Sequence, residues 1–192
     1  MRKSEKQRTT FETNIYVSID LDGTGKSEIS TGIGFFDHML NLLFKHGGFN
    51  GTVKCEGDLE VDTHHSMEDI GIVLGLAFNE ALGDKIGIRR YGTFHVPMDE
   101  ALVRCCVDIS GRSFLYYDVE FTRELIGDLE TETVEEFLRA FTDNAKITLN
   151  VATLSGKNNH HICEALFKAL ARALKDAVVI DGDSLPSTKG LI

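Results

Sequence analysis

The chain has 192 residues, of which 42% are hydrophobic and 26% charged, with a formal net charge of −10. This composition is typical of a soluble globular protein, and the acidic balance argues against nucleic acid or an anionic membrane as the main partner. The first residues contain no apolar segment typical of a signal peptide and no apolar run is long enough to span a bilayer, so we expect a cytoplasmic protein.

Five elements are predicted in the first half of the chain. Apolar residues alternate with polar ones from Phe11 to Ile19, which predicts a half-buried strand with Glu12 on its polar face. A short strand near residues 27–30 follows, then a helix over residues 34–46, a strand over residues 52–56 and a helix over residues 64–82 that Gly83 ends. The predicted order is β-β-α-β-α.

The same order is predicted again in the second half. Strands are expected over residues 100–109 and 113–121, a helix over residues 132–144, a strand over residues 147–154 and a helix over residues 160–177. Proline is nearly absent and there is no linker, so residues 1–92 and 93–192 are expected to be two similar halves packed as one unit. The predicted fold class is α+β, in two layers, with antiparallel sheets backed by helices.

The last helix of each half begins with the same motif, H-H-x-x-E. It occurs at His64, His65 and Glu68 and returns 96 residues later at His160, His161 and Glu164. The first histidine and the glutamate share one helix face, whereas the second histidine points about 100° around the axis. A single copy is typical of a polar helix start, but two copies at one spacing predict a duplicated half-site for a divalent metal.

The first helix of each half offers a further donor at a matching position. His38 lies 26 residues before His64, and Glu136 lies 24 residues before His160. Both could ligate a metal, although an exposed helix glutamate is often only solvated. On the strands, the 96-residue offset between the two motifs matches Glu12 tentatively with Asp108. Glu12 could equally be an ordinary solvent-facing carboxylate.

Ligands that point in two directions from one helix are suited to a shared site. We expect His64 and Glu68 to meet a histidine of the second motif, and His160 and Glu164 to meet one of the first. Because consecutive histidines can bridge a subunit interface, a symmetric homo-oligomer with shared sites follows as a hypothesis.

Basic residues are few, and several lie at turns. Arg90 and Arg112 are expected at turns or strand ends, and the C-terminal segment contains Ser187 and Lys189. A hydroxyl, an ammonium group and backbone N–H groups freed by Gly190 could cradle a phosphate together with an arginine. The alternative is a frayed C-terminus.

Together these motifs resemble the imidazoleglycerol-phosphate dehydratase family over nearly the whole chain. The resemblance is carried by RTTFET at residues 8–13, TGIGFFDHML at 31–40, DTHHSMED at 62–69, GIRRYG at 87–92, VPMDE at 96–100, DISGR at 108–112, GKNNHH at 156–161 and PSTKG at 186–190. Several long motifs in this order are far more specific than any one of them.

The resemblance implies a hydro-lyase of histidine biosynthesis with a duplicated fold like that of ribosomal protein S5 domain 2. It implies a cage of 24 subunits, two Mn²⁺ ions at each shared active site, and dehydration of D-erythro-imidazole glycerol phosphate to imidazole acetol phosphate. Carried over by position, the metal ligands are His38, His64, His65, Glu68, His160, His161 and Glu164. Glu136 is a further candidate, at a position where many family members have histidine.

The resemblance also assigns roles in binding and catalysis. The phosphate contacts would be Arg90, Arg112, Ser187 and Lys189. Glu12 would contact the substrate as the acid/base carboxylate, while His65, His161 and Glu164 are further catalytic candidates. Cations on the substrate's imidazole nitrogens would stabilise an imidazolate, which can expel the neighbouring hydroxyl. Two other readings stay open, a dinuclear metallophosphatase and a non-catalytic metal-storing cage.

Overall fold

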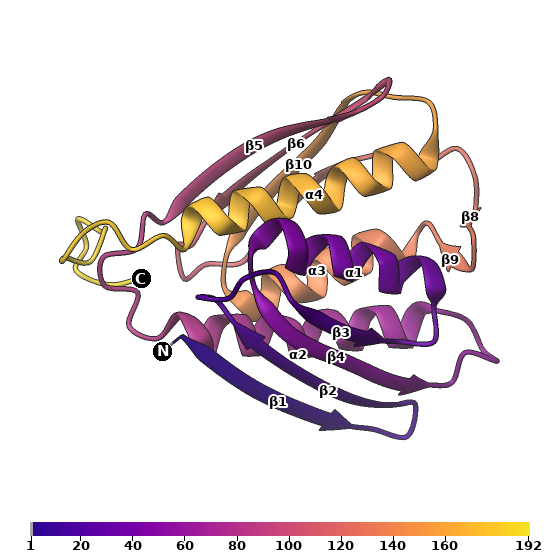
Figure 1. The fold of residues 1–192 in the computed structure, drawn as a ribbon, viewed down its shortest axis with the longest axis horizontal. Helices are drawn as coiled ribbons and strands as arrows, with labels where there is room; N and C mark the ends of the chain where they lie inside the picture. Colours follow the sequence, from indigo (N-terminus) through magenta and orange to yellow (C-terminus); the bar gives the residue numbers. More distant parts are fainter. Residues whose placement is uncertain (1) are drawn as a thin grey trace.

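A computed structural model describes residues 2–192, and Met1, the first residue of the predicted first half, lies outside the described residues. Two four-stranded sheets form the outer layers, and the four helices pack between them (Figure 1). The sheets are thus backed by helices on one face only, as the alternating burial of strands such as β2 requires.

The first half contributes one sheet and two helices. Its elements are β1 (Lys3–Thr9), β2 (Thr13–Asp20), β3 (Ser27–Ser30), α1 (Gly34–Gly47), β4 (Asn50–Gly57) and α2 (His64–Leu82). The strand order is β1-β2-β4-β3, in which β3 pairs with β4 in parallel and the other pairs are antiparallel.

The second half repeats this plan and adds a small hairpin. Its elements are β5 (Tyr91–Met98), β6 (Ala101–Asp108), β7 (Phe114–Asp118), β8 (Leu125–Ile126), β9 (Leu129–Glu130), α3 (Thr133–Ala145), β10 (Thr148–Ser155) and α4 (Asn159–Ala177). The sheet order β5-β6-β10-β7 matches that of the first sheet, with β7 parallel to β10. The β8–β9 hairpin has no counterpart in the first half.

The duplication is confirmed, but each half begins with a strand that the predicted β-β-α-β-α order omits. Edge strand β1 is almost entirely polar and buries only Ser4, so its sequence has no apolar alternation. Edge strand β5 contains Gly92 and Pro97, which weaken a strand signal, although proline is tolerated at a sheet edge. The predicted first strand also began too early, because Phe11 is fully exposed in the β1–β2 turn.

The two halves share one aromatic core. Phe36 of α1 contacts Phe137 of α3 edge-on, with ring centroids 5.1 Å apart, and Phe137 stacks on Phe167 of α4 at 5.8 Å. Two glycines of α2 allow α3 to approach closely, because a Cβ at Gly71 or Gly75 would lie 2.6 Å from a backbone carbonyl oxygen of α3. This packing holds the helices that bear the motif histidines in a fixed relation.

Candidate metal and substrate site

The β8–β9 hairpin fixes the ends of the helices that carry the candidate ligands. Asp128 in its turn accepts hydrogen bonds from Gly34 N and Phe35 N at the start of α1, at 2.5 and 2.9 Å. Glu130 accepts from the backbone and hydroxyl of Thr63, the N-cap of α2, at 2.8 and 2.6 Å. Both carboxylates satisfy free N–H groups at a helix N-terminus, where negative charge is favoured. A segment of the second half therefore holds two helices of the first.

One group of predicted ligands meets where α1 and α4 pack together. Glu164 Oε1 lies 2.9 Å from His38 Nε2 and 3.0 Å from His160 Nε2. Glu164 is 7% exposed, whereas about half of each histidine side chain is exposed. The structure thus joins a donor of the first half to the motif of the second half.

Lys168 belongs to the same group and was missed by the sequence reasoning. Its Nζ donates to Glu164 Oε2 at 2.5 Å. Burial would raise the pKa of Glu164, but hydrogen bonds from Lys168, His38 and His160 outweigh it and lower the pKa to about 2. The sequence signal was present, because Lys168 follows Glu164 by four residues and shares its helix face.

The corresponding group on α2 and α3 is more open. His64 Nε2 lies 3.9 Å from Glu68 Oε2, and both side chains are nearly half exposed. Glu136 lies in α3 at the position equivalent to that of His38 in α1. The residues at the same spacings around each of them are buried, namely Phe36, Met39 and Leu40 in α1 and Val134, Phe137 and Leu138 in α3. Among residues 2–192, Glu136 has no hydrogen-bonded or ion-paired side-chain partner. In the described chain no hydrogen bond or ion pair joins it to His64 or Glu68.

The two imidazole rings of each motif are nearly perpendicular to one another. The ring planes of His64 and His65 differ by 83°, and those of His160 and His161 by 87°. His65 Nδ1 lies 3.0 Å from Asp58 and its Nε2 lies 3.7 Å from Glu12. The hydrogen bond with Asp58 and the nearby charge of Glu12 raise the pKa of His65.

His161 has a comparable pair of carboxylates. Its Nδ1 lies 2.8 Å from Glu100 Oε2, and its Nε2 lies 3.7 Å from Asp99. The hydrogen bond with Glu100 and the charges of Glu100 and Asp99 raise the pKa of His161. Asp58 and Glu100 were not predicted as site residues, although Glu100 lies within one of the motifs that carry the family resemblance.

The tentative match of Glu12 with Asp108 is wrong. Glu12 directly precedes β2, and the residue that directly precedes the equivalent strand β6 is Glu100. Asp108 lies at the other end of β6, where it pairs with Arg90. The 96-residue offset between the motifs does not hold for the strands, because the second half has the β8–β9 hairpin between β7 and α3, whereas β2 and β6 begin only 88 residues apart, at Thr13 and Ala101 (101 − 13 = 88).

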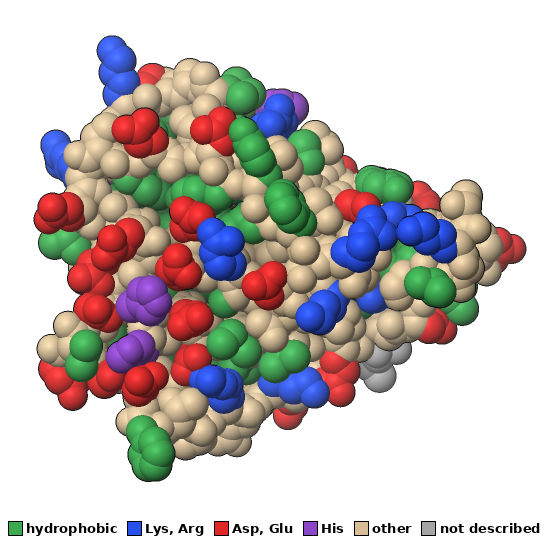
Figure 2. All heavy atoms as spheres, turned by 180° about the vertical axis from the view of Figure 1, so that it is seen from behind, with side chains coloured by type: hydrophobic (Ala, Val, Ile, Leu, Met, Phe, Trp, Pro, Cys, Tyr) green, Lys and Arg blue, Asp and Glu red, His purple; other side chains and the backbone are tan. Residues whose placement is uncertain are grey.

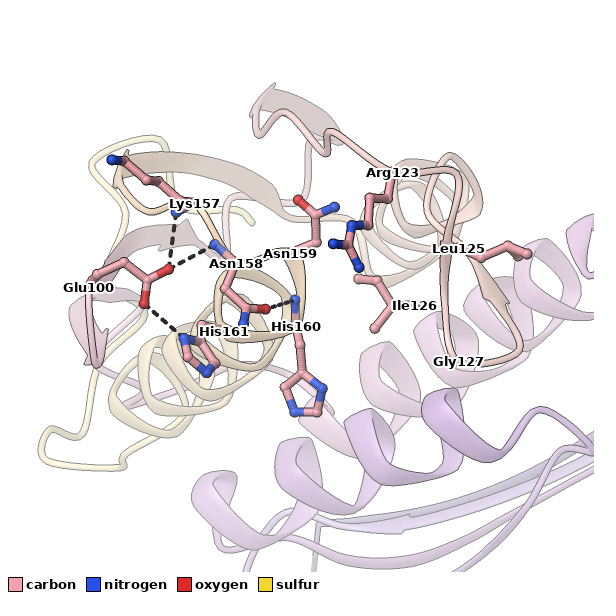
Figure 3. Close-up of a pocket in the computed structure, with 10 residues that line it drawn as sticks. All are labelled: Glu100, Arg123, Leu125, Ile126, Gly127, Lys157, Asn158, Asn159, His160 and His161. Carbon is pink, nitrogen blue, oxygen red and sulfur yellow. Dashed lines mark hydrogen bonds and ion pairs between the residues drawn. The ribbon is translucent and has the colours of Figure 1, made fainter.

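A cleft of ≈ 650 Å³ opens beside the second motif. Its lining includes His160, His161, Glu100, Arg123 and Lys157, together with the β8–β9 turn (Figure 3). In the close-up the imidazoles of His160 and His161 point in different directions from α4, while Arg123 faces them from the segment that leads into β8. The cleft can therefore receive a ligand between a pair of imidazoles and a cationic side chain.

Hydrogen bonds join the C-terminal tail to the segment that leads into β5. Gly87 N donates to Ser184 O at 2.9 Å, Arg90 Nη1 donates to Pro186 O at 2.7 Å, and Ser187 Oγ donates to Leu191 O at 2.9 Å. Arg90 is also held by Asp108, at 2.7 and 3.2 Å. Arg90 is therefore joined to the tail at the residue before Ser187.

Arg112 reaches the same end of the molecule. The neighbouring Gly111 lies against the chain terminus, where a Cβ would be 2.7 Å from the carbonyl carbon of Ile192. Arg112 and Lys189 are exposed, and neither side chain forms an ion pair within the described chain. Their positive charges are thus free for an anion.

The C-terminal tail lies at one end of the molecule, and the N-termini of α2 and α4, where the two motifs begin, lie at the other (Figure 1). Arg90 N donates to Ala177 O at the last turn of α4, whereas Glu164 lies near its first turn. At a rise of about 1.5 Å per residue, these two positions are about 20 Å apart. Figure 2 shows histidine side chains among acidic side chains toward one end of a face and basic side chains gathered toward the other.

A family model described as imidazoleglycerol-phosphate dehydratase matches residues 31–174, which is most of the chain. The chain belongs to the imidazoleglycerol-phosphate dehydratase family. The dehydratase of Thermoanaerobacter sp. (strain X514) is 60% identical over 194 residues, with 100% of both chains covered. The dehydratase of Clostridium novyi (strain NT) is 58% identical and covers 100% of this chain and 98% of the relative.

Solved structures of imidazoleglycerol-phosphate dehydratases have the same fold. The Staphylococcus aureus subsp. aureus N315 structure has a TM-score of 0.84 at 43% identity, covering 93% of this chain and 99% of that one. The Pyrococcus furiosus structure, in complex with (S)-C348, has a TM-score of 0.84 at 37% identity and covers 97% and 100%. The family resemblance and the duplicated α+β fold are confirmed.

The donor types present suit the manganese that the dehydratase family implies. Imidazole nitrogens and carboxylate oxygens bind divalent ions of this kind. Among residues 2–192, however, no group of three or more His, Cys, Asp and Glu side chains is arranged to hold an ion. Glu164 Oε1 instead lies between His38 and His160 and is hydrogen-bonded to both. The chemistry of the donors fits, while one chain does not assemble a complete coordination shell.

Two further observations concern the chain as a whole. In the part of the chain that the structure describes, none of the helices has the length and apolar character needed to cross a membrane. Cys55, Cys105 and Cys163 are buried, Cys106 is half-buried, and all four are free thiols.

Proposed function

We propose that this protein dehydrates D-erythro-imidazole glycerol phosphate to imidazole acetol phosphate and water, as a step of histidine biosynthesis. The observation that carries the proposal is that one member of this family contains both a metal-donor group and a basic group. One end of the chain holds imidazole and carboxylate donors, and the other holds a basic cradle. A substrate with an imidazole ring and a phosphate needs both.

Two Mn²⁺ ions per active site are proposed as the cofactor. The proposed ligands are His38, His64, His65, Glu68, His160, His161 and Glu164, with Glu136 as an eighth candidate. When bound to the substrate's imidazole, the cations would make the ring an acceptor of electrons. The ring would then have the role of the carbonyl group that usually acidifies a neighbouring carbon-bound proton.

Glu12 is proposed as the acid/base that moves the carbon-bound proton. Its carboxylate is about half exposed and lies 3.7 Å from His65 Nε2. Within the described chain it accepts no side-chain hydrogen bond, so it is free to turn toward a substrate at this end of the molecule. His65 and His161 are the other candidate bases, and Glu164 would hold its charge throughout, since its pKa of about 2 keeps it ionised.

The phosphate group is proposed to bind Arg90, Arg112, Ser187 and Lys189. Arg112 and Lys189 would supply uncommitted charge, and Arg90 would be oriented by Asp108. Because this cradle lies about 20 Å from Glu164 along α4, we infer that another copy of the chain completes each site. A closed homo-oligomer of 24 subunits with shared sites is the proposed assembly, and the four free thiols support a reducing cytoplasm as its compartment.

The test supplies imidazole glycerol phosphate to Mn²⁺-loaded protein and measures two products in parallel. Formation of imidazole acetol phosphate without release of inorganic phosphate is the expected result. Release of phosphate instead would identify a metallophosphatase, and inertness of the fully loaded protein would identify a metal-storing cage. Either outcome would reject the dehydratase.

A further inference from the structure

Each second motif histidine is held at the same ring atom by a carboxylate. His65 Nδ1 is hydrogen-bonded to Asp58, and His161 Nδ1 to Glu100. A neutral imidazole that carries its proton on Nδ1 and donates it to a carboxylate presents the lone pair of Nε2. Both rings are therefore set to offer Nε2 to a ligand.

The two carboxylates occupy non-equivalent places in the duplicated halves. Asp58 directly follows β4 in the first half, whereas Glu100 directly precedes β6 in the second. A contact inherited passively from the duplication would use equivalent positions. The same ring atom is instead held from two different loops, which points to a requirement on the rings themselves.

We propose that Asp58 and Glu100 are positioning residues, which fix the tautomer and ring orientation of His65 and His161 so that Nε2 can bind a divalent cation. The inference rests on the proposed function, because it takes these histidines to be metal ligands. A carboxylate behind a ligating imidazole also increases the basicity of the ligand.

Of the two carboxylates, Asp58 is the simpler one to test by substitution. Its side chain is 21% exposed and, in the described chain, is hydrogen-bonded only to His65. Its backbone N donates to Glu12 O at 3.1 Å, so the residue also joins the β1–β2 turn to the start of α2. Changing the side chain removes the contact with the ring and leaves this backbone bond available.

Glu100 has a second task in its loop. Besides His161 it accepts backbone hydrogen bonds from Lys157 N and Asn158 N, at 3.1 and 2.8 Å (Figure 3). These bonds hold the segment that leads into α4. Substitution of Glu100 should therefore affect both the ring and the stability of this segment, whereas substitution of Asp58 should affect the ring alone.

The carboxylates behind the two rings also explain why Glu12 and Glu100, which precede equivalent strands, have different surroundings. Glu100 is committed to three hydrogen bonds, and they lower its pKa to about 2. In the first half Asp58 takes the Nδ1 position, so Glu12 is left uncommitted. This division leaves the carboxylate of Glu12 without a hydrogen bond and those of Asp58 and Glu100 bound to the two histidines.

The experiment measures Mn²⁺ binding to the full chain with Asp58→Ala, Asp58→Asn and Glu100→Gln. Free Mn²⁺ is followed by electron paramagnetic resonance during titration, and melting temperatures are recorded in chelator. Loss of a carboxylate behind a ligating histidine typically weakens metal affinity about 10–100-fold. We expect a loss in this range for Asp58→Ala, a smaller one for Asp58→Asn, and no change in melting temperature for either. Glu100→Gln should weaken binding and also lower the melting temperature.

Glu60→Gln is the matched control, since it removes a neighbouring exposed charge that has no ring partner. Wild-type affinity in the Asp58 variants would overturn the inference while leaving the proposed function intact. It would also be overturned if Glu60→Gln weakened binding equally, or if the Asp58 variants lost affinity only along with thermal stability. A wild-type protein that binds no Mn²⁺ would reject the proposed metal site and this inference together.

Discussion

Glu12 and Glu100 occupy equivalent positions, yet their surroundings differ. Glu100 is held by His161 and two backbone N–H groups, which keep its pKa near 2. Glu12 is about half exposed and faces His65 across 3.7 Å. A group that exchanges protons must be able to change its protonation state and reach the substrate. Of these two carboxylates, only that of Glu12 is free of hydrogen bonds within the described chain and can turn toward a substrate.

Replacing Glu12 with glutamine should therefore affect turnover far more than binding. General acid–base groups typically contribute about 10²–10⁴-fold to rate, and a loss of kcat in this range is expected for Glu12→Gln. Mn²⁺ content and KM should stay close to wild type, because the substitution preserves shape and removes no proposed ligand. Steady-state kinetics together with metal analysis checks this, and near-normal kcat would remove Glu12 from the mechanism.

Lys189 should contribute to substrate binding through its charge. The Lys189→Ala variant loses one charge-assisted contact to phosphate, which is typically worth about 1.5–3 kcal/mol, so KM should rise at least several-fold. Lys26→Ala is a suitable control, since Lys26 is also exposed and its side chain has no partner within the described chain. If both variants have the wild-type KM, Lys189 does not bind the phosphate.

At the scale of elements, the β8–β9 hairpin has a larger role than its size suggests. Asp128 satisfies the first N–H groups of α1, the helix that presents His38. Removing a side chain that caps a helix N-terminus costs about 0.5–2 kcal/mol. Asp128→Ala should lower the free energy of unfolding by this amount, measured by denaturant titration in chelator. An unchanged midpoint would mean that α1 does not depend on the hairpin.

The same cap predicts a dependence on pH. Burial raises the pKa of Asp128, but hydrogen bonds from Phe35 N and Gly34 N outweigh it and place the pKa below its usual value of 3.8. A carboxylate with a lowered pKa stabilises the fold fully above its unfolded pKa, and this contribution is lost as the pH falls through the folded value. The stability difference between wild type and Asp128→Ala should therefore be constant near neutral pH and shrink below about pH 4. A difference that grew on acidification would contradict the cap.

The elements also show how much of the fold the sequence pattern predicts. The bounds of α2 match the predicted residues 64–82, because apolar periodicity and a glycine at positive φ mark its ends. Strand β1 could not be predicted, since an edge strand with polar residues on both faces carries no alternation. Likewise the motifs identified the histidines, whereas Asp58 and Asp128 reach the site through loops whose positions depend on tertiary packing.

For the whole molecule, the proposed shared site predicts that copies of the chain assemble through it. Metal bound by histidines that point away from one helix should hold copies of the chain together. Chelation of the wild type, or the substitution His64→Ala, should shift the assembly to smaller species, and Mn²⁺ should restore only the wild type. Size-exclusion chromatography with light scattering measures this. A His64→Ala variant that lacks metal but keeps the native assembly would count against metal-linked subunits.

Complementation between two impaired variants tests the shared site most directly. Glu12→Gln and Lys189→Ala chains with different tags are co-expressed, and assemblies that contain both are purified and assayed at low substrate concentration. If the carboxylate and the phosphate cradle of one site come from different copies, some mixed sites contain both intact groups, and activity should clearly exceed the mean of the two parents. Activity equal to that mean would show that each chain builds its own site, contrary to the geometry of α4.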